Sequence, residues 1–188
     1  MTENPVPVPF RGFPKIPRFS RDIIITEKID GTNGIVAIEQ DGQFLVGSRT
    51  RWITPATDNA GFAKWAYANK QALIDLLGPG THFGEWWGQG IQRGYGLKEK
   101  RFSLFNVSRW TPEHTAGLCY VVPILYQGPF VSAAISDVLF KLEAEGSVAA
   151  LGYDKPEGIV IYHIAGGYLF KKTLVGDEYH KGELKEGV

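Results

Sequence analysis

Short apolar runs bounded by turn residues constrain this fold most, because they divide the first fifty residues into segments of strand length. The runs IIITEKI (23–29), GIVAIE (34–39) and QFLVGSR (43–49) each predict a β-strand. The dipeptide Asp41-Gly42 lies between the last two runs and is a hairpin turn signal. Further strands are expected over 82–87, 101–107 and 118–126, and a closing hairpin is expected to join 157–164 to 168–174.

Two other segments carry apolar residues at helical spacing. The first predicted helix runs from about Asn59, a favourable N-cap, to Leu77, and the second covers about 132–145. A chain of 188 residues can bury one sizeable core, and no linker divides it. These patterns predict an α+β fold with mainly antiparallel sheets and flanking helices. We expect a Pro-rich N-terminal extension over 1–20 and a single domain over 21–188.

Charge and composition exclude several classes of protein. Twenty Lys and Arg residues balance twenty Asp and Glu residues, which argues against a protein that coats nucleic acid by charge alone. Two local basic clusters stand out, and they consist of Arg11, Lys15, Arg18 and Arg21, and of Arg93, Lys98, Lys100 and Arg101. No apolar run reaches the roughly eighteen residues of a membrane helix, so no membrane partner is expected. The first residues lack the pattern of a signal peptide, and a cytoplasmic location is expected.

The first predicted strand runs directly into Lys28-Ile29-Asp30-Gly31. A lysine at the end of a strand, followed by a glycine turn, can present its amine to a cleft. Alone, the pattern also fits an ordinary exposed lysine before a turn. Other motifs farther along the chain favour a functional role for this lysine.

The chain resembles the covalent nucleotidyltransferase superfamily, which comprises RNA ligases, DNA ligases and messenger-RNA capping enzymes. Members carry a lysine motif, a glutamate strand, an aromatic strand, a Glu-Gly motif and a lysine strand, in that order. The matching segments are Lys28-Ile-Asp-Gly31, Gly84-Glu85-Trp-Trp-Gly88, Phe102-Ser-Leu-Phe105-Asn-Val107, Glu157-Gly158-Ile-Val-Ile and Phe170-Lys171-Lys172. The resemblance spans residues 23–174 and implies an ATP-grasp-like ligase adenylation domain.

Within the superfamily, the sequence is most similar to the RNA ligases of the double-strand-sealing and RNA-editing type. Asn33 stands where DNA ligases and capping enzymes usually have arginine, and the run GEWWGQGIQ resembles a stretch of those RNA ligases. The resemblance implies ATP as the nucleotide, Mg²⁺ as the metal with Mn²⁺ as an alternative, and a role in RNA repair. The implied substrate is a pair of RNA ends in a nicked duplex or on a scaffold.

The resemblance also implies a role for each motif residue. Lys28 would form a lysyl-AMP adduct, and Lys171 and Lys172 would contact the phosphates. Glu85 would bind the ribose, and Phe105 would stack on adenine while Phe102 lies in the core. The nucleotide site would further include Glu27, Asn33, Arg49 and Glu157, and the metal would be held by Asp30 and Glu157.

Two departures from the family pattern leave alternatives open. The last motif is usually Lys-x-Lys, whereas Lys171 and Lys172 are adjacent and should point to opposite faces of a strand. Only fourteen residues follow Leu174, so no appended OB domain is expected, and a partner protein is the alternative source of nucleic-acid binding. The competing functions are a GTP-dependent capping-type guanylyltransferase, a minimal DNA ligase and a non-catalytic RNA-binding domain of the same fold.

Overall fold

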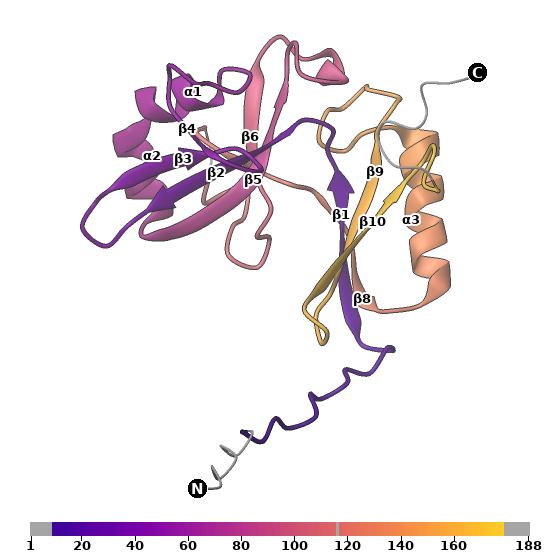
Figure 1. Ribbon diagram of the computed structural model, residues 1–188. Helices are drawn as coiled ribbons and strands as arrows, with labels where there is room; N and C mark the ends of the chain where they lie inside the picture. The colour runs from indigo at the N-terminus through magenta and orange to yellow at the C-terminus, as the bar shows by residue number, and fades with distance from the viewer. Residues whose placement is uncertain (1–8, 116, 179–188) are drawn as a thin grey trace, which may run out of the picture.

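The computed structural model describes residues 9–115 and 117–178. These residues form two sheets and three α-helices, which confirms the α+β class (Figure 1). One sheet has six strands in the order β4-β3-β2-β5-β6-β7, and the other has four in the order β10-β9-β1-β8. All neighbouring strands are antiparallel except β6 and β7, so the expectation of mainly antiparallel sheets is also confirmed.

The six-stranded sheet is built from the first two thirds of the chain. Its strands are β2 (Thr32–Ile38), β3 (Phe44–Gly47), β4 (Trp52–Ile53), β5 (Gly80–Gly88), β6 (Lys100–Leu104) and β7 (Tyr120–Val121). Helices α1 (Phe62–Ala68) and α2 (Lys70–Leu77) cover one face and bury the larger of the hydrophobic clusters. In that cluster the rings of Phe62 and Phe102 lie 4.9 Å apart.

A pair of glycines makes room for this aromatic core. Gly34 and Gly84 lie opposite each other on β2 and β5. A Cβ atom on Gly34 would stand 2.7 Å from the Phe62 ring, and one on Gly84 would stand 2.6 Å from the Phe102 ring. Only glycine allows such close approach, so the first glycine of the GEWWG segment has a packing role.

The four-stranded sheet combines the start of the described chain with its end. Strands β1 (Asp22–Lys28), β8 (Ile124–Pro129), β9 (Gly158–His163) and β10 (Tyr168–Thr173) form it, and helix α3 (Ser132–Glu145) packs on one face. Residues on β1 alternate between the two faces of the sheet. Ile23 and Ile25 belong to the cluster beneath α3, whereas Ile24 and Thr26 face the cavity described below.

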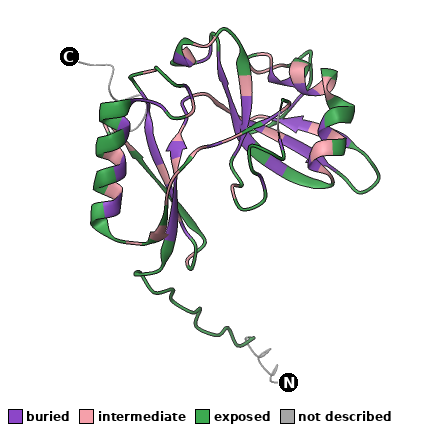
Figure 2. Ribbon diagram, turned by 180° about the vertical axis from the view of Figure 1, so that it is seen from behind, coloured by how far each residue is buried: buried purple, intermediate pink, exposed green. Residues whose placement is uncertain are grey.

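The two sheets meet along a third, smaller cluster that includes Ile29, Trp87, Tyr95 and Val122. Figure 1 shows the chain crossing between the sheets directly after β1, and Figure 2 shows buried residues running along the strands of both sheets. The end of β1, and with it Lys28, therefore lies at the junction of the two sheets.

Several details differ from the expected elements. The helix expected over 59–77 is two helices, because the backbone leaves helical geometry at Asn69, with φ −108° and ψ 19°. At the start of the first helix, the side chain of Asp58 rather than that of Asn59 accepts a hydrogen bond from the backbone. Asp58 Oδ1 accepts from the backbone N–H of Ala63 at 2.7 Å. The strand expected over 118–126 is also divided, because its halves, β7 and β8, belong to different sheets. Strand β4 and the short 3₁₀ turn η1 (Gly94–Gly96) were not expected.

Cys119 is buried in the larger cluster, and burial raises the pKa of its thiol to about 12. None of the helices in the described ranges is long and apolar enough to cross a membrane.

Candidate active site

Lys28 ends β1 and is paired with a buried carboxylate. In the sheet register Lys28 lies opposite Gly158, the first residue of β9, so Glu157 comes next to the lysine amine. Lys28 Nζ donates a hydrogen bond to Glu157 Oε2 and forms an ion pair with it. The side chain of Glu157 is 6% exposed and that of Lys28 is 21% exposed. The amine therefore lies at the edge of the buried region, where a second molecule can reach it.

Glu85 is a second buried carboxylate near the lysine. Alternation along β5 places Trp86 in the core with α1 and leaves Glu85 on the opposite face. Glu85 accepts hydrogen bonds from the backbone N–H of Gly31, at 3.0 Å, and from Nδ2 of Asn33, at 3.3 Å. Desolvation raises the pKa of Glu85 to about 7, although the charge of Lys28 acts in the opposite direction. Asn33 and the turn after Lys28 thus hold this carboxylate in place.

The glycine of the Lys-Ile-Asp-Gly motif is required by a close approach of two chain segments. A Cβ atom on Gly31 would lie 2.5 Å from the carbonyl oxygen of Trp86 and 2.7 Å from Cβ of Trp87. Any larger residue would push the turn away from β5, because backbone atoms cannot move aside as a flexible side chain can. The hydrogen bond from Gly31 to Glu85 depends on this close approach.

Asp30 is tied to the loop that follows β5. Arg93 donates from Nε to Asp30 Oδ2 at 3.1 Å and from a terminal nitrogen to the carbonyl oxygen of Lys155 at 3.0 Å. The backbone N–H of Asp30 donates to the hydroxyl oxygen of Tyr95 at 2.8 Å. Arg93 therefore connects the lysine turn with the segment that precedes Glu157. The sequence shows Arg93 as one residue of a basic cluster and does not reveal this role, and Tyr95 has no sequence signal.

Glu27 faces away from Lys28 because neighbouring residues of a strand alternate. Its carboxylate accepts hydrogen bonds from Ser147 Oγ at 2.6 Å and from the backbone N–H groups of Val148 and Ala149 at 2.9 and 2.8 Å. Burial raises the pKa of Glu27, and these bonds oppose the rise. The side chain thus anchors the turn after α3, so any contribution of this residue to a nucleotide site has to come from its backbone.

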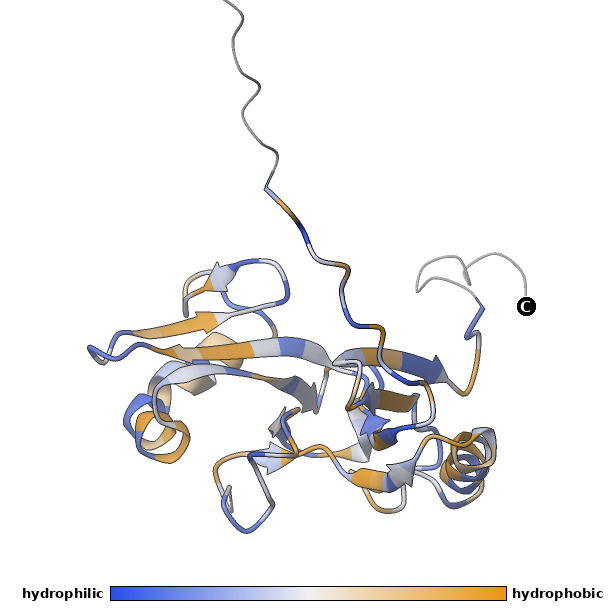
Figure 3. Cartoon of the chain, turned by 90° about the horizontal axis from the view of Figure 1, so that it is seen from below, coloured by the Kyte–Doolittle hydropathy of each residue, from blue (hydrophilic) through white to orange (hydrophobic). Residues whose placement is uncertain are grey.

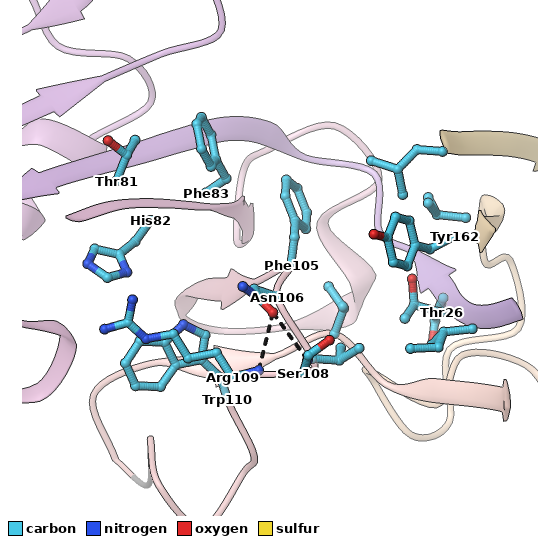
Figure 4. Close-up of a pocket in the computed structure, with 16 residues that line it drawn as sticks. Thr26, Thr81, His82, Phe83, Phe105, Asn106, Ser108, Arg109, Trp110 and Tyr162 are labelled. Carbon is cyan, nitrogen blue, oxygen red and sulfur yellow. Dashed lines mark hydrogen bonds between the residues drawn. The ribbon is translucent and has the colours of Figure 1, made fainter. Parts of the chain in front are cut away.

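A cavity of about 830 Å³ lies between the two sheets, next to the last residues of β1. Its lining includes Thr26 on β1, Val160 and Tyr162 on β9, and Phe105 directly after β6. In Figure 4 the ring of Phe105 stands between Phe83, from β5, and Tyr162. Phe105 is 40% exposed, whereas Phe102 is fully buried in the core, as expected for residues three apart on a strand. An exposed ring in such a cavity is able to stack on a planar ligand.

The two lysines of β10 point to opposite faces of the sheet. Lys171 lies opposite Val160 in the register, which in turn lies opposite Thr26, so all three share the cavity face. Lys172 lies opposite Ile159, which belongs to the cluster beneath α3, and its Nζ pairs with Asp177 Oδ2 at 3.2 Å. Lys171 is therefore the lysine on the side of the cavity. Thr173, two residues on, stands where a second lysine would share that face.

Arg49 lies farther out. It follows the end of β3 by two residues and is exposed. Among the residues that the structure describes, Arg49 forms no hydrogen bond or ion pair with Lys28, Glu85 or Glu157. The neighbouring Arg51 donates to the carbonyl oxygen of Thr57 at 3.5 Å, in the same loop.

The buried oxygens of Asp30 and Glu157 are ligands of the kind that magnesium prefers. Magnesium is usually held by one or two carboxylates together with water and substrate phosphates, rather than by an all-protein cage. Within the described ranges no group of three or more His, Cys, Asp and Glu residues is arranged to enclose a metal. The donor set fits an ion that arrives with a phosphate ligand.

Comparison with known proteins agrees with this geometry. The family model described as RNA ligase matches residues 21–173. The fold is similar to a lysine-to-methionine mutant of Naegleria gruberi RNA ligase solved with AMP and Mn, with a TM-score of 0.58 and 22% identity over 82% of this chain. A second structure of the Naegleria gruberi enzyme, a mutant with ATP and Mn, has a TM-score of 0.58 and 23% identity over 82% of this chain. This chain covers 50% of the first and 49% of the second. A comparison with curated proteins found no match.

Proposed function

Because this chain belongs to the RNA ligase family, we propose that it is an ATP-dependent RNA ligase that works through a lysyl-AMP intermediate. The observation that carries the proposal is Lys28, at the end of β1, paired with Glu157 beside a cavity that exposes an aromatic ring. The structures of the Naegleria enzyme with ATP, AMP and Mn support the choice of nucleotide and of a divalent metal.

ATP would enter with its adenine against Phe105 in the cavity. Stacking of a base on an aromatic ring contributes about 1–3 kcal/mol. The ribose hydroxyls would bind Glu85, which Asn33 and Gly31 orient, and Lys171 would contact the phosphates from the cavity face of β10. Arg49 would contact the ribose or the RNA end phosphate only if its loop moves inward.

In the first step Lys28 Nζ attacks the α-phosphorus of ATP. An N–P bond forms, the bond between the α-phosphorus and the bridging oxygen breaks, and pyrophosphate leaves. The amine must lose a proton, and Glu157 Oε2 is already within hydrogen-bonding reach to receive it. Asp30 and Glu157 would hold the Mg²⁺ ion, or Mn²⁺ in its place, which neutralises negative charge on the phosphates.

The later steps use the stored AMP. An oxygen of the RNA 5′-phosphate attacks the phosphorus of lysyl-AMP, which gives an RNA with AMP at its end and returns the lysine. The 3′-hydroxyl of the other RNA then attacks the 5′-phosphate and releases AMP. We propose that both ends are held in a nicked duplex or on a scaffold, because a chain with zero net charge attracts single strands weakly.

We further propose that residues 21–188 act as one domain behind an extension over 1–20, in a role such as RNA repair. A partner protein that adds nucleic-acid binding remains part of the proposal, as does a cytoplasmic location. The chain spans about half the length of the solved relatives that it matches.

The proposal is tested by incubating the protein with Mg²⁺ and either α-labelled ATP or α-labelled GTP. We expect label on the chain with ATP, in an acid-labile bond. Stronger labelling with GTP would turn the assignment towards a capping-type enzyme, and sealing of nicked DNA but not RNA towards a small DNA ligase. Absence of any label, with RNA binding intact, would indicate the non-catalytic RNA-binding alternative.

Lys28→Ala identifies the nucleophile. The variant should lose at least 99% of the label, since Lys28 Nζ is the amine that pairs with Glu157 at the end of β1. Lys64→Ala, which removes an exposed lysine from α1, is the matched control and should label normally. Label on the Lys28 variant at the level of the parent would move the nucleophile elsewhere.

A further inference from the structure

The described N-terminal extension carries a pattern with a period of three. From Phe10 onward, every third residue is large and apolar, and this set is Phe10, Phe13, Ile16 and Phe19. A second set with the same spacing is basic and consists of Lys15, Arg18 and Arg21. Residues 9–21 contain four Lys and Arg residues and no Asp or Glu. The segment is therefore strongly basic in a chain whose net charge is zero.

The spacing matters because residues 9–21 contain no helix or strand. Pro14 and Pro17 fix their own φ angles near −65° and keep Phe13 and Ile16 out of the α-helical region. These limits favour an extended backbone, and of the extended conformations polyproline II has three residues per turn. A three-residue period then puts the apolar side chains along one edge and the basic side chains along another. Figure 3 shows hydrophobic and hydrophilic residues alternating along the extension as it leaves the body of the protein.

The base of the extension contacts the body of the protein at Phe19, but the rest of its apolar edge does not. The rings of Phe19 and Phe130 lie 4.3 Å apart. His163 Nδ1 accepts from the backbone N–H of Gly166, so Nε2 carries the proton and donates to the carbonyl oxygen of Phe19 at 2.8 Å. Beyond this anchor, Phe10, Phe13 and Ile16 are 94%, 85% and 74% exposed. Three large apolar side chains in water, on a fixed base, indicate a surface that a partner covers.

We propose that residues 9–21 form an arm that binds the RNA flanking the ends to be joined. The proposal rests on the ligase function proposed above. An apolar edge with aromatic rings beside a row of cations is the combination that binds nucleic acid without reading its sequence: rings stack on bases, and cations contact phosphates. A protein partner would need an acidic surface. Four cations without any acidic residue favour RNA, the polyanion on which an RNA ligase would act.

The position of the arm sets the length of RNA that it reaches. The arm joins β1 at Asp22, whereas Lys28 is at the other end of the same strand (Figure 1). Seven strand residues span about 20 Å, and a thirteen-residue polyproline II arm adds up to about 40 Å. An arm that starts at this distance and runs away from the body, as in Figure 1, contacts an A-form RNA duplex several base pairs or more from the reacting phosphate. Short substrates should therefore be insensitive to the arm.

Two variants of the full chain test the arm. The charge variant is Lys15→Gln, Arg18→Gln and Arg21→Gln, and the apolar variant is Phe10→Ser, Phe13→Ser and Ile16→Ser. The control for charge removes three exposed lysines from the helices, by Lys64→Gln, Lys70→Gln and Lys141→Gln. Each protein is measured for binding to nicked RNA duplexes with about five and about eighteen base pairs on each side, over a series of salt concentrations.

On the long duplex the charge variant should bind about tenfold or more weakly, and the slope of log affinity against log salt should fall by about 2 to 3, since each phosphate contact contributes roughly one. The apolar variant should lose about tenfold with little change of slope. Both variants should match the parent on the short duplex, and the control should match it on both. Self-adenylylation should be unchanged, because it needs only the nucleotide site.

Parental binding by both arm variants on the long duplex would overturn the proposal. So would an apolar variant that binds RNA normally but loses a self-association of the parent in sedimentation, because the apolar edge would then be covered by a second copy. Failure of the ligase proposal is distinguishable, because it would appear as absent labelling of the parent whereas the binding series is read without catalysis.

Discussion

The carboxylate of Glu85 shows how one buried residue links the site to solution pH. Its ordinary pKa of 4.5 is raised to about 7 by desolvation, although Lys28 and the N–H of Gly31 favour the charged form. The folded protein therefore holds a proton on Glu85 at pH values where the unfolded chain has released it. The free energy of unfolding should fall as the pH rises from about 4.5 to about 7.

Glu85→Gln should remove this pH dependence. The shift corresponds to about 3 kcal/mol at most, so the parent should lose up to that amount between pH 4.5 and 7 through this group while the variant does not. The measurement is urea unfolding at pH 5 and pH 7.5, and Glu143→Gln, an exposed carboxylate on α3, is the control. A parent and variant with the same pH profile would contradict the shifted pKa.

At the scale of the element, strand β10 separates two adjacent lysines. Lys171 shares the cavity face with Val160, whereas Lys172 shares the face of Ile159 and pairs with Asp177. Lys171→Ala should lower the rate of labelling by ATP about 100-fold, since preorganised cations act strongly on developing charge. Lys172→Ala should change the rate less than about threefold, because an exposed ion pair contributes little. Equal losses in both variants would mean that β10 changes its register or bulges when ATP binds.

The loop between β5 and β6 gives a second prediction at this scale. Arg93 bonds both Asp30 and the carbonyl oxygen of Lys155, and the single ammonium of a lysine cannot reproduce this fork. Arg93→Lys should lower the labelling rate about 10- to 100-fold and raise the metal concentration needed for half-maximal rate. Lys98→Ala, an exposed residue of the same loop, should leave both unchanged. An unchanged metal requirement in the Arg93 variant would leave the arginine with a purely structural role.

At the scale of the whole molecule, the two sheets are expected to unfold together. All the Trp residues lie between positions 52 and 110, so fluorescence reports on the six-stranded sheet and its helices. Helix α3 belongs to the other sheet, and the cluster that contains Trp87 and Val122 joins the two. Urea transitions followed by fluorescence and by far-ultraviolet circular dichroism should coincide. Transitions that separate would divide the chain into two folding units and contradict a single domain over 21–188.

The sequence by itself determined the local elements and the order of the motifs. Short apolar runs bounded by turn residues predicted most of the strands, and Lys28, Glu85 and Glu157 could be selected because the order of the motifs is a property of the chain alone. Phe102 and Phe105 could be sorted into core and cavity, since residues three apart on a strand face opposite ways.

Only the tertiary structure decided which side chains meet. The run over 118–126 predicts one strand, yet the chain changes from one sheet to the other at Pro123. This division is set by long-range strand pairing and not by local propensity. Lys171 and Lys172 are equivalent in composition, and the register against β9 distinguishes them. The links from Arg93 to Asp30 and from Glu27 to Ser147 join residues 63 and 120 positions apart. Such contacts depend on how the two sheets are packed, and no local pattern in the sequence carries that information.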